Sequence, residues 1–518
     1  MLTFVRSFRV LVVLASVVAA TLAISSWSTP TAGQTLPRLF DGSFAASASL
    51  PGRLRLNVRS RRARVALQAL DAPALSMNLF DNTEMGVTKT KVERPRADRL
   101  VWHGRGDDGS QVALSVVKGA LAGTVYRFGQ TFDIVPDGDG LYRVSELDAA
   151  AFPTDDPEFD AIPAADAKTG TPRGAPSVPT MSADGVPQID VMVVWTPAAR
   201  NAVGGTQAAI ESLVQSAVAN ANLAYTNSGV NARLRLVHSE EVSFTETNIQ
   251  SDLTSLATAG DGVLDRVPSL RDQYGADIVT MIGNGYVAAG SCGYGYIMST
   301  PATSFAPWAF DVVDQSCAAG YLSYAHEVGH NEGLQHDPPN SSVSPAYPYA
   351  YGYQDPSGAF RTVLSYGSSQ RVPFFSNPSV LYNTLPTGTA SQNNAAALNL
   401  TAPIVTQFRA AVDGTVSGGS TPPPPPPCSY SVSPTSLSFS TSAASVNVTV
   451  TTTSGCSWSS STSASWVSAV GTGTASGAAK VTVAQNSGGA RSTGVTVAGV
   501  KVSVSQQGAK ALPRGKRK

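Results

Sequence analysis

Residues 325–337 read Ala-His-Glu-Val-Gly-His-Asn-Glu-Gly-Leu-Gln-His-Asp and contain three of the five histidines in the chain. Because residues four apart lie on one face of a helix, His326 and His330 can direct two imidazoles at one metal ion. Glu327 lies about 100° further round the helix, close enough to reach a metal-bound water without being a ligand. Gly333 adopts a left-handed conformation without penalty, so it can end the helix and return His336 to the same ion.

This set of ligands is typical of a catalytic zinc site. Three neutral imidazole nitrogens leave one coordination position open, whereas a structural zinc site is closed by a fourth protein ligand, usually cysteine. No cysteine lies in residues 325–337. The alternative interpretation is a helix with scattered surface histidines. Chance weighs against it, because the composition of the chain would produce this pattern on the order of once in a million such chains.

The pattern resembles the metzincin metallopeptidases, whose signature is His-Glu-x-x-His-x-x-Gly-x-x-His. Asp337, which follows the third histidine, makes it most similar to the adamalysin (reprolysin-like) branch. The resemblance covers roughly residues 187–411. It implies that His326, His330 and His336 bind one Zn²⁺ and that Glu327 is the general base.

Two further features follow from the resemblance. Metzincins place a methionine turn beneath the zinc, and the matching segment, residues 361–367, has Leu364 at the methionine position. Leucine nearly conserves the volume of methionine. Tyr366 matches a tyrosine that contacts the zinc or the transition state in the astacin and serralysin branches. An edge strand antiparallel to the substrate is expected within residues 285–300, for which the alternative is a glycine-rich loop held by Cys292.

Length and composition indicate a secreted protein of several domains. A chain of 518 residues is too long for one core, so two to four domains are expected. The 36 basic residues balance the 36 acidic ones, so no nucleic acid or other polyanionic partner is implied. Charged residues make up 14%, well below the usual quarter or so, which favours a protein rich in strands and loops.

The first 33 residues have the form of a secretory signal peptide. Arg6 and Arg9 precede an apolar run that ends near Ile24, followed by small and polar residues. The alternative is a retained N-terminal anchor. No other stretch approaches the roughly 20 apolar residues that a membrane helix needs, so the mature form is expected to be extracellular and without a membrane span.

The four cysteines suit an oxidising compartment. Three pairings are possible, and the proline-rich break between the second and third cysteines favours pairing within each side. The expected disulfides are Cys292–Cys317, beside the metal helix, and Cys428–Cys456, near the C-terminus.

Residues 34–185 are predicted to be a β-rich propeptide that ends in a linker. Short strands are expected at 100–104, 112–117, 123–128 and 141–144, and Asp-Gly-Asp-Gly at 137–140 indicates a hairpin. The position of this segment, between a signal peptide and a protease-like domain, resembles a metallopeptidase propeptide. It has no cysteine, which excludes a thiol switch onto zinc; an aspartate or plain steric blockage both stay open as the means of inhibition.

Residues 186–411 are predicted to form the catalytic domain, an α/β fold with a mixed twisted sheet. Apolar strands at 189–195, 233–237 and 276–282 alternate with helical patterns at 206–224 and 250–274. Such alternation indicates a sheet with helices on its faces. A last helix is expected at 398–411.

A proline-rich linker at 412–427 leads to a predicted β-sandwich at 428–508, and a basic tail occupies 509–518. The sandwich loosely resembles the BACON domain, an immunoglobulin-like module. Trp458 or Trp466 could stack on carbohydrate, which would give contact with a cell surface, although the preferred interpretation places one or both in the core. The basic tail suits a solvated end or an anionic surface.

The sequence thus predicts a secreted zinc metalloendopeptidase made as a zymogen, acting on proteins or peptides. One alternative is a surface- or matrix-binding protein with a catalytically inert metal domain. Another is a zinc hydrolase for a non-peptide substrate. The sequence makes no prediction about calcium.

Overall fold

The computed structural model describes residues 35–41, 56–155, 180–182, 185–341, 343–412, 430–452, 458–473 and 476–509. The chain divides into two compact units, residues 1–417 and 418–518. The predicted signal peptide, the proline-rich segment after residue 412, the tail after residue 509 and the predicted Cys428–Cys456 pair lie outside the described residues. No helix in the described ranges is both long and apolar enough to cross a membrane.

The N-terminal part of the first unit is a nine-stranded antiparallel sheet with the order β1-β2-β9-β8-β7-β6-β5-β4-β3. Its large side chains, among them Trp102, Leu114 and Phe132, form a buried cluster on one face. The predicted hairpin turn at 137–140 joins β8 to β9, which pair antiparallel. The strands are β1 Phe40–Asp41, β2 Asn57–Val65, β3 Ala74–Phe80, β4 Thr83–Arg96, β5 Arg99–Gly106, β6 Gln111–Val117, β7 Ala120–Arg127, β8 Gln130–Pro136 and β9 Tyr142–Leu147.

The second part of this unit is a mixed sheet with helices, which confirms the α/β prediction in outline. The strand order is β11-β10-β12-β14-β13; the first four strands are parallel and β13 runs antiparallel to β14 at the edge. The strands are β10 Gln188–Trp195, β11 Arg233–Glu241, β12 Ile278–Gly283, β13 Gly293–Gly295 and β14 Phe310–Asp314. The helices are α1 Pro197–Ala202, α2 Gln207–Ser228, α3 Ile249–Ala257, α4 Arg266–Tyr274, α5 Ser323–Asn331 and α6 Asn394–Val405.

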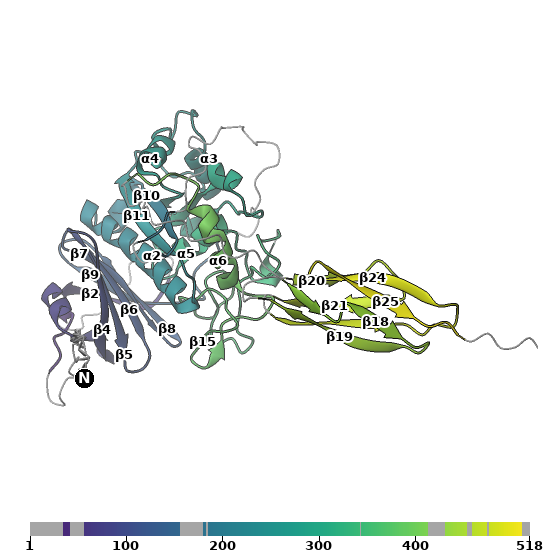
Figure 1. Ribbon diagram of the computed structural model, residues 1–518. Helices are drawn as coiled ribbons and strands as arrows, with labels where there is room; N and C mark the ends of the chain where they lie inside the picture. Colours follow the sequence, from purple (N-terminus) through teal and green to yellow (C-terminus); the bar gives the residue numbers. More distant parts are fainter. Residues whose placement is uncertain are drawn as a thin grey trace, which may run out of the picture. The chain divides into compact units, whose positions relative to one another are not determined.

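Helix α2 lies between the two sheets and joins them into one core (Figure 1). Thr206 caps its first turn by accepting a hydrogen bond from the Ala209 amide, and Gly229 ends it at φ +70°. The polar side of the helix also meets protein: Asn220 donates to the Thr124 hydroxyl at 2.9 Å, and Lys118 pairs with Glu211 at 3.1 Å. The sequence predicted that one apolar face of this helix would be buried. The structure shows that the N-terminal sheet covers its polar face as well.

Two predicted elements differ from their expected bounds. The last helix, α6, was expected at residues 398–411 and spans Asn394–Val405, so it begins and ends earlier than predicted. The edge strand expected within residues 285–300 forms only over Gly293–Gly295. Both differences lie at element boundaries, where local pattern carries little information.

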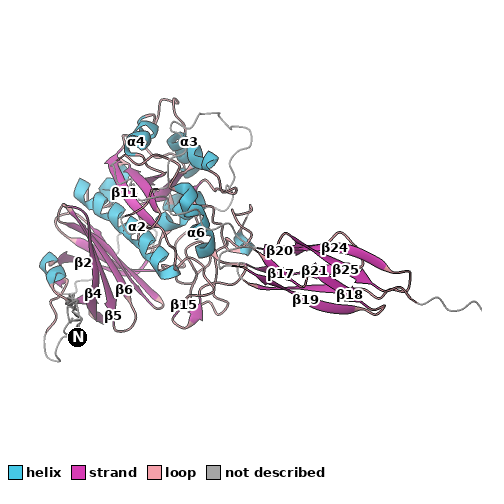
Figure 2. Cartoon of the chain, viewed as in Figure 1, coloured by secondary structure: helices cyan, strands magenta, loops and turns pink. Residues whose placement is uncertain are grey.

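The C-terminal unit is composed of strands (Figure 2) that form two sheets, with the orders β17-β19-β23-β21 and β18-β25-β24-β20-β22, over a shared apolar core. Trp458 belongs to this core, and the Arg491 guanidinium lies 4.4 Å from the ring centroid of Trp466. The Trp458 ring is therefore buried, and the Trp466 ring is partly covered. The strands are β17 Ser431–Ser433, β18 Ser436–Phe439, β19 Ala444–Thr451, β20 Trp458–Ser461, β21 Val467–Val470, β22 Thr472–Gly473, β23 Gly477–Val483, β24 Arg491–Val497 and β25 Val500–Gln506.

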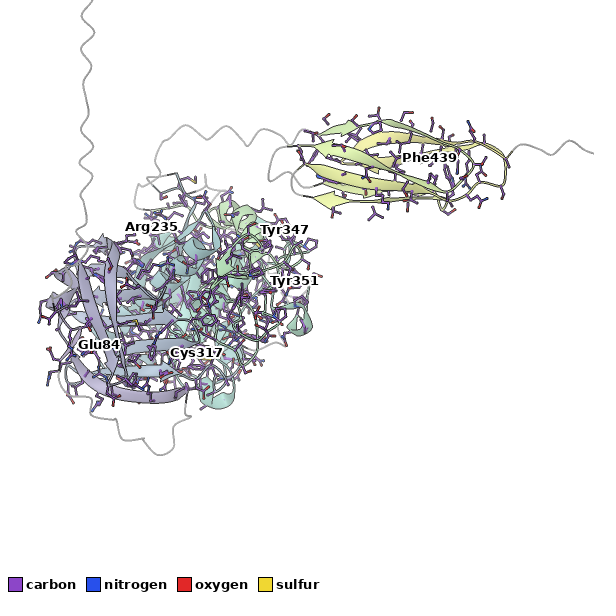
Figure 3. The ribbon with its side chains drawn as sticks, turned by 90° about the horizontal axis from the view of Figure 1, so that it is seen from below. Glu84, Arg235, Cys317, Tyr347, Tyr351 and Phe439 are labelled. Atoms are coloured by element: carbon purple, nitrogen blue, oxygen red, sulfur yellow. A yellow bond between two sulfur atoms is a disulfide. The ribbon has the colours of Figure 1, made fainter. Side chains whose placement is uncertain are left out.

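The predicted Cys292–Cys317 disulfide is present, with the two Cα atoms 5.7 Å apart; Cys317 is labelled in Figure 3. It links the residue before β13 to the loop that enters α5. Both cysteines are fully buried. The bond therefore holds the edge strand and the metal helix in a fixed relation.

We expect the Cys292→Ala/Cys317→Ala double variant to lose about 3 kcal/mol of unfolding free energy, because the closed loop spans 25 residues. Urea unfolding followed by tryptophan fluorescence would measure the loss. Reductant should destabilise the first unit of the wild type by a similar amount and leave the first unit of the variant unchanged; equal stability of this unit in the two proteins would contradict the prediction.

Candidate active site

Helix α5 carries the first two histidines of the motif, and a tight turn returns the third. The helix begins after Leu322, which is in the left-handed region at φ +67°, and Gly333 follows its end at φ +92°. A Cβ atom at Gly333 would lie 2.6 Å from Cβ of Ala346, so both the backbone angle and the space require glycine. His326, His330 and His336 are all buried.

The three imidazoles converge on one point through their Nε2 atoms. The Nε2 separations are 3.1 Å for His326–His336, 3.1 Å for His326–His330 and 3.0 Å for His330–His336. Nitrogens bound tetrahedrally at 2.0–2.1 Å from a zinc ion are about 3.3 Å apart, so the triad fits such an ion.

A backbone carbonyl fixes each ring on its far side. The Nδ1 atoms donate to Val363 O at 2.8 Å (His326), to Leu334 O at 2.9 Å (His330) and to Asn340 O at 3.3 Å (His336). A proton on Nδ1 leaves the Nε2 lone pair for a metal. Burial, together with the neighbouring imidazoles, lowers the pKa of His326 and His336 well below the usual value, which favours the neutral form that binds metal.

Glu327 lies between the metal helix and the edge strand β13. A Cβ atom at Gly293 would lie 2.4 Å from Glu327 Oε1, and one at Gly295 would lie 3.1 Å from Oε2. The two glycines therefore make room for this carboxylate. It is 1% exposed, and one of its oxygens lies within 4.8 Å of ligand atoms of His326 and Asp155.

The segment matched to the methionine turn packs beneath α5. A Cβ atom at Gly329 would lie 3.1 Å from Leu364 Cδ2, so this leucine directly supports the turn of helix between the first two histidines. Asp337 joins the segment to the histidine loop, since its carboxylate accepts hydrogen bonds from the Tyr366 amide and from Asn340 Nδ2, both at 2.8 Å. The Tyr366 hydroxyl lies 2.9 Å from His336 Nε2. All the residues singled out from the motif thus meet at one site.

A second group at this site, centred on Asp155, was not predicted from the sequence. The Asp155 carboxylate receives hydrogen bonds from Arg371 Nη2 and from the Ser323 hydroxyl, each at 2.7 Å. Its backbone carbonyl accepts from the Tyr366 hydroxyl. Phe152, three residues earlier, stacks on Tyr321 with ring centroids 4.0 Å apart. The sequence assigned Asp155 to a linker, and nothing in its local pattern distinguishes it from the acidic residues around it.

Comparison with known proteins identifies relatives of this chain. Residues 186–394 match a model of metallopeptidase family M12B, reprolysin-like. A peptidyl-Asp metalloendopeptidase of Xanthomonas campestris pv. campestris is 30% identical over 385 residues, which cover 69% of this chain and 88% of the relative. Peptidyl-Asp metalloendopeptidases of Stenotrophomonas maltophilia strains R551-3 and K279a are 33% and 31% identical, covering 67% and 63% of this chain and 85% and 81% of theirs.

We expect the wild-type chain to hold one metal ion and His330→Ala to hold none, because two imidazoles do not retain the ion through purification. Elemental mass spectrometry of the purified proteins would measure the stoichiometry. His103→Ala, which removes a histidine paired with Glu93 in the N-terminal sheet, is the matched control and should keep its metal. A full equivalent of metal in His330→Ala would contradict the assignment.

Proposed function

The chain belongs to the reprolysin-like M12B metallopeptidases, and from that premise we propose that it is a secreted, zinc-dependent endopeptidase made as a zymogen. The observation that carries the proposal is the convergence of three Nε2 atoms, 3.0–3.1 Å apart, beside a buried glutamate and a glycine-lined edge strand. These are the parts that peptide hydrolysis needs: a metal site, a base and a template for extended backbone.

Each group has a separate role in the proposed reaction. Zinc, when bound, lowers the pKa of a coordinated water and polarises the scissile carbonyl. Glu327 takes the proton of the attacking water and hands it to the leaving amine. The Tyr366 hydroxyl donates a hydrogen bond to the carbonyl oxygen as negative charge develops there. Its present contact with the Asp155 carbonyl supports this role, because it donates to a peptide oxygen next to His336.

The zymogen part of the proposal is supported by polar contacts between the N-terminal sheet and the rest of the unit. Gln370 binds the β7–β8 turn, donating to Arg127 O and Gln130 O at 2.8 Å and accepting from the Gly129 amide at 2.8 Å. Asn227 and Gln111 exchange two amide hydrogen bonds. Groups of this kind can be exposed to water again at little cost, which suits a segment that is later released.

We also propose that the substrate is cleaved at an aspartate. The relatives carry peptidyl-Asp in their names, and they align with this chain over most of their length. A buried arginine, Arg371, lies beside the metal helix and binds a carboxylate there. A cationic group at that place favours an acidic side chain over a neutral one of the same size.

Glu327→Gln is expected to retain the metal and the fold and to lose about 10²–10⁴-fold in kcat on a peptide substrate, because the amide cannot accept the proton. The assay is cleavage of a quenched fluorescent peptide containing aspartate by the processed protein, with and without a chelator. Glu241→Gln, which alters an exposed ion pair with Arg200, is the matched control. Near-normal turnover by Glu327→Gln, or chelator-resistant turnover by the wild type, would contradict the mechanism.

A further inference from the structure

A buried ion pair joins two segments that are 216 residues apart, next to the metal-binding histidines. Arg371 Nη2 and Asp155 Oδ2 are 2.7 Å apart, and the two side chains are 1% and 2% exposed. Ser323 Oγ donates to the other carboxylate oxygen at 2.7 Å. Both Asp155 oxygens therefore have partners, one charged and one neutral.

The pocket that holds this carboxylate is built by the metal site itself. Ser323 opens helix α5 three residues before His326, so it lies one turn from the first metal-binding histidine. Asp155 Oδ2 is 3.7 Å from His326 Nδ1, the ring nitrogen that faces away from the place where the three Nε2 atoms converge. The carboxylate thus occupies a pocket beside the ligands and does not take a place among the three Nε2 atoms.

Arg371 is held so that one end of its guanidinium points into this pocket. Its Nη1 donates to Tyr321 O at 3.2 Å, and its Cζ lies 4.5 Å from the ring centroid of Tyr321. A second buried arginine, Arg361, donates to Ser369 O at 3.1 Å and to the Tyr321 hydroxyl at 2.7 Å. Arg361 adds positive potential while its donors are engaged elsewhere, which leaves Arg371 as the group that binds the acid.

The backbone around Asp155 follows the course expected of a substrate. Thr154 O accepts a hydrogen bond at 3.3 Å from the amide of Cys292, the residue before edge strand β13. One residue later, the Asp155 carbonyl accepts from Tyr366, whose hydroxyl is 2.9 Å from His336 Nε2. The segment therefore crosses from the edge strand to the metal-binding histidines while it places one side chain in the pocket.

We propose that Arg371 and Ser323 form the subsite for the acidic side chain of the substrate, and that Asp155 fills this subsite in the uncleaved chain and keeps it closed. This inference rests on the proposed peptidase function. It names the residues that would select the substrate side chain and the residue that would block the subsite. Removal of Asp155 leaves a desolvated guanidinium without its counter-charge, so the opened pocket strongly favours another carboxylate. A neutral substrate side chain of the same shape as aspartate would fill the pocket but would not supply the negative charge that the guanidinium lacks.

Selectivity is tested with two quenched peptides that differ only in one Asp or Asn, cleaved by the processed protein. The ratio of kcat/KM for the Asp peptide to that for the Asn peptide should fall by on the order of 100-fold in Arg371→Gln and several-fold in Ser323→Ala. Arg266→Gln, at a side chain that is 70% exposed, should keep the wild-type ratio. An unchanged ratio in Arg371→Gln would overturn the proposal.

Arg371→Gln leaves Asp155 buried without its partner in the precursor, which can prevent folding. The double variant Asp155→Asn/Arg371→Gln replaces the pair with two amides and leaves neither charge buried, so its peptide ratio tests the subsite if the single variant does not fold. A wild type that cleaves neither peptide would contradict the proposed function, and the binding experiment then decides on the subsite separately.

Closure of the subsite is tested by binding in the full chain carrying Glu327→Gln, which prevents self-processing. Fluorescence anisotropy with the labelled Asp peptide should show no binding when Asp155 is present. Asp155→Ala should bind the Asp peptide at least about tenfold more tightly than the Asn peptide, and adding Arg371→Gln should remove that preference. Asp139→Asn, at an exposed turn, is the control and should stay closed. The proposal would be overturned if Asp155→Ala bound the two peptides equally or bound neither of them.

Discussion

The site depends on bringing three imidazole nitrogens to within 3.0–3.1 Å of one another in a buried place. Three neutral acceptors at that distance have no proton to share, so their lone pairs repel unless a cation lies between them. The protein maintains the arrangement with carbonyls of Leu334, Asn340 and Val363 that fix the far side of each ring. The turn at Gly333 and the packing of Leu364 under Gly329 bring these carbonyls to their positions.

The rest of the catalytic sheet positions the other reacting groups around that point. Gly293 and Gly295 open the edge strand to the Glu327 carboxylate, and the Cys292–Cys317 disulfide joins the start of that strand to the entry of α5. Asp337 holds Tyr366 next to His336 through the backbone amide of the tyrosine. Covalent, steric and hydrogen-bonding constraints thus act separately on the positions of Glu327, the three histidines and Tyr366.

In the proposed mechanism, the ion pair of Asp155 and Arg371 would link inhibition to selectivity. A buried guanidinium is costly to leave unpaired, so the same charge that would attract an acidic substrate would also hold the N-terminal segment in a precursor. The surrounding contacts are of the same polar kind, such as Gln370 with the β7–β8 turn and Asn220 with Thr124. These polar contacts act beside an apolar one, because Tyr126, Val135 and Phe152 share a buried cluster with residues of α2.

Local pattern was sufficient wherever the information lies within a few residues. The 4- and 6-residue spacings of His326, His330 and His336, the cap at Thr206, the turn at 137–140 and the alternation of strands and helices could all be read from the sequence, because helical and strand periodicities are short-range. Tertiary structure alone decided the Asp155 pocket, the covered polar side of α2 and the short length of β13. Asp155 meets Ser323 and Arg371 across 168 and 216 residues, and each of the three looks ordinary in its own segment. Only the folded chain brings them close enough for charge and burial to give them a role.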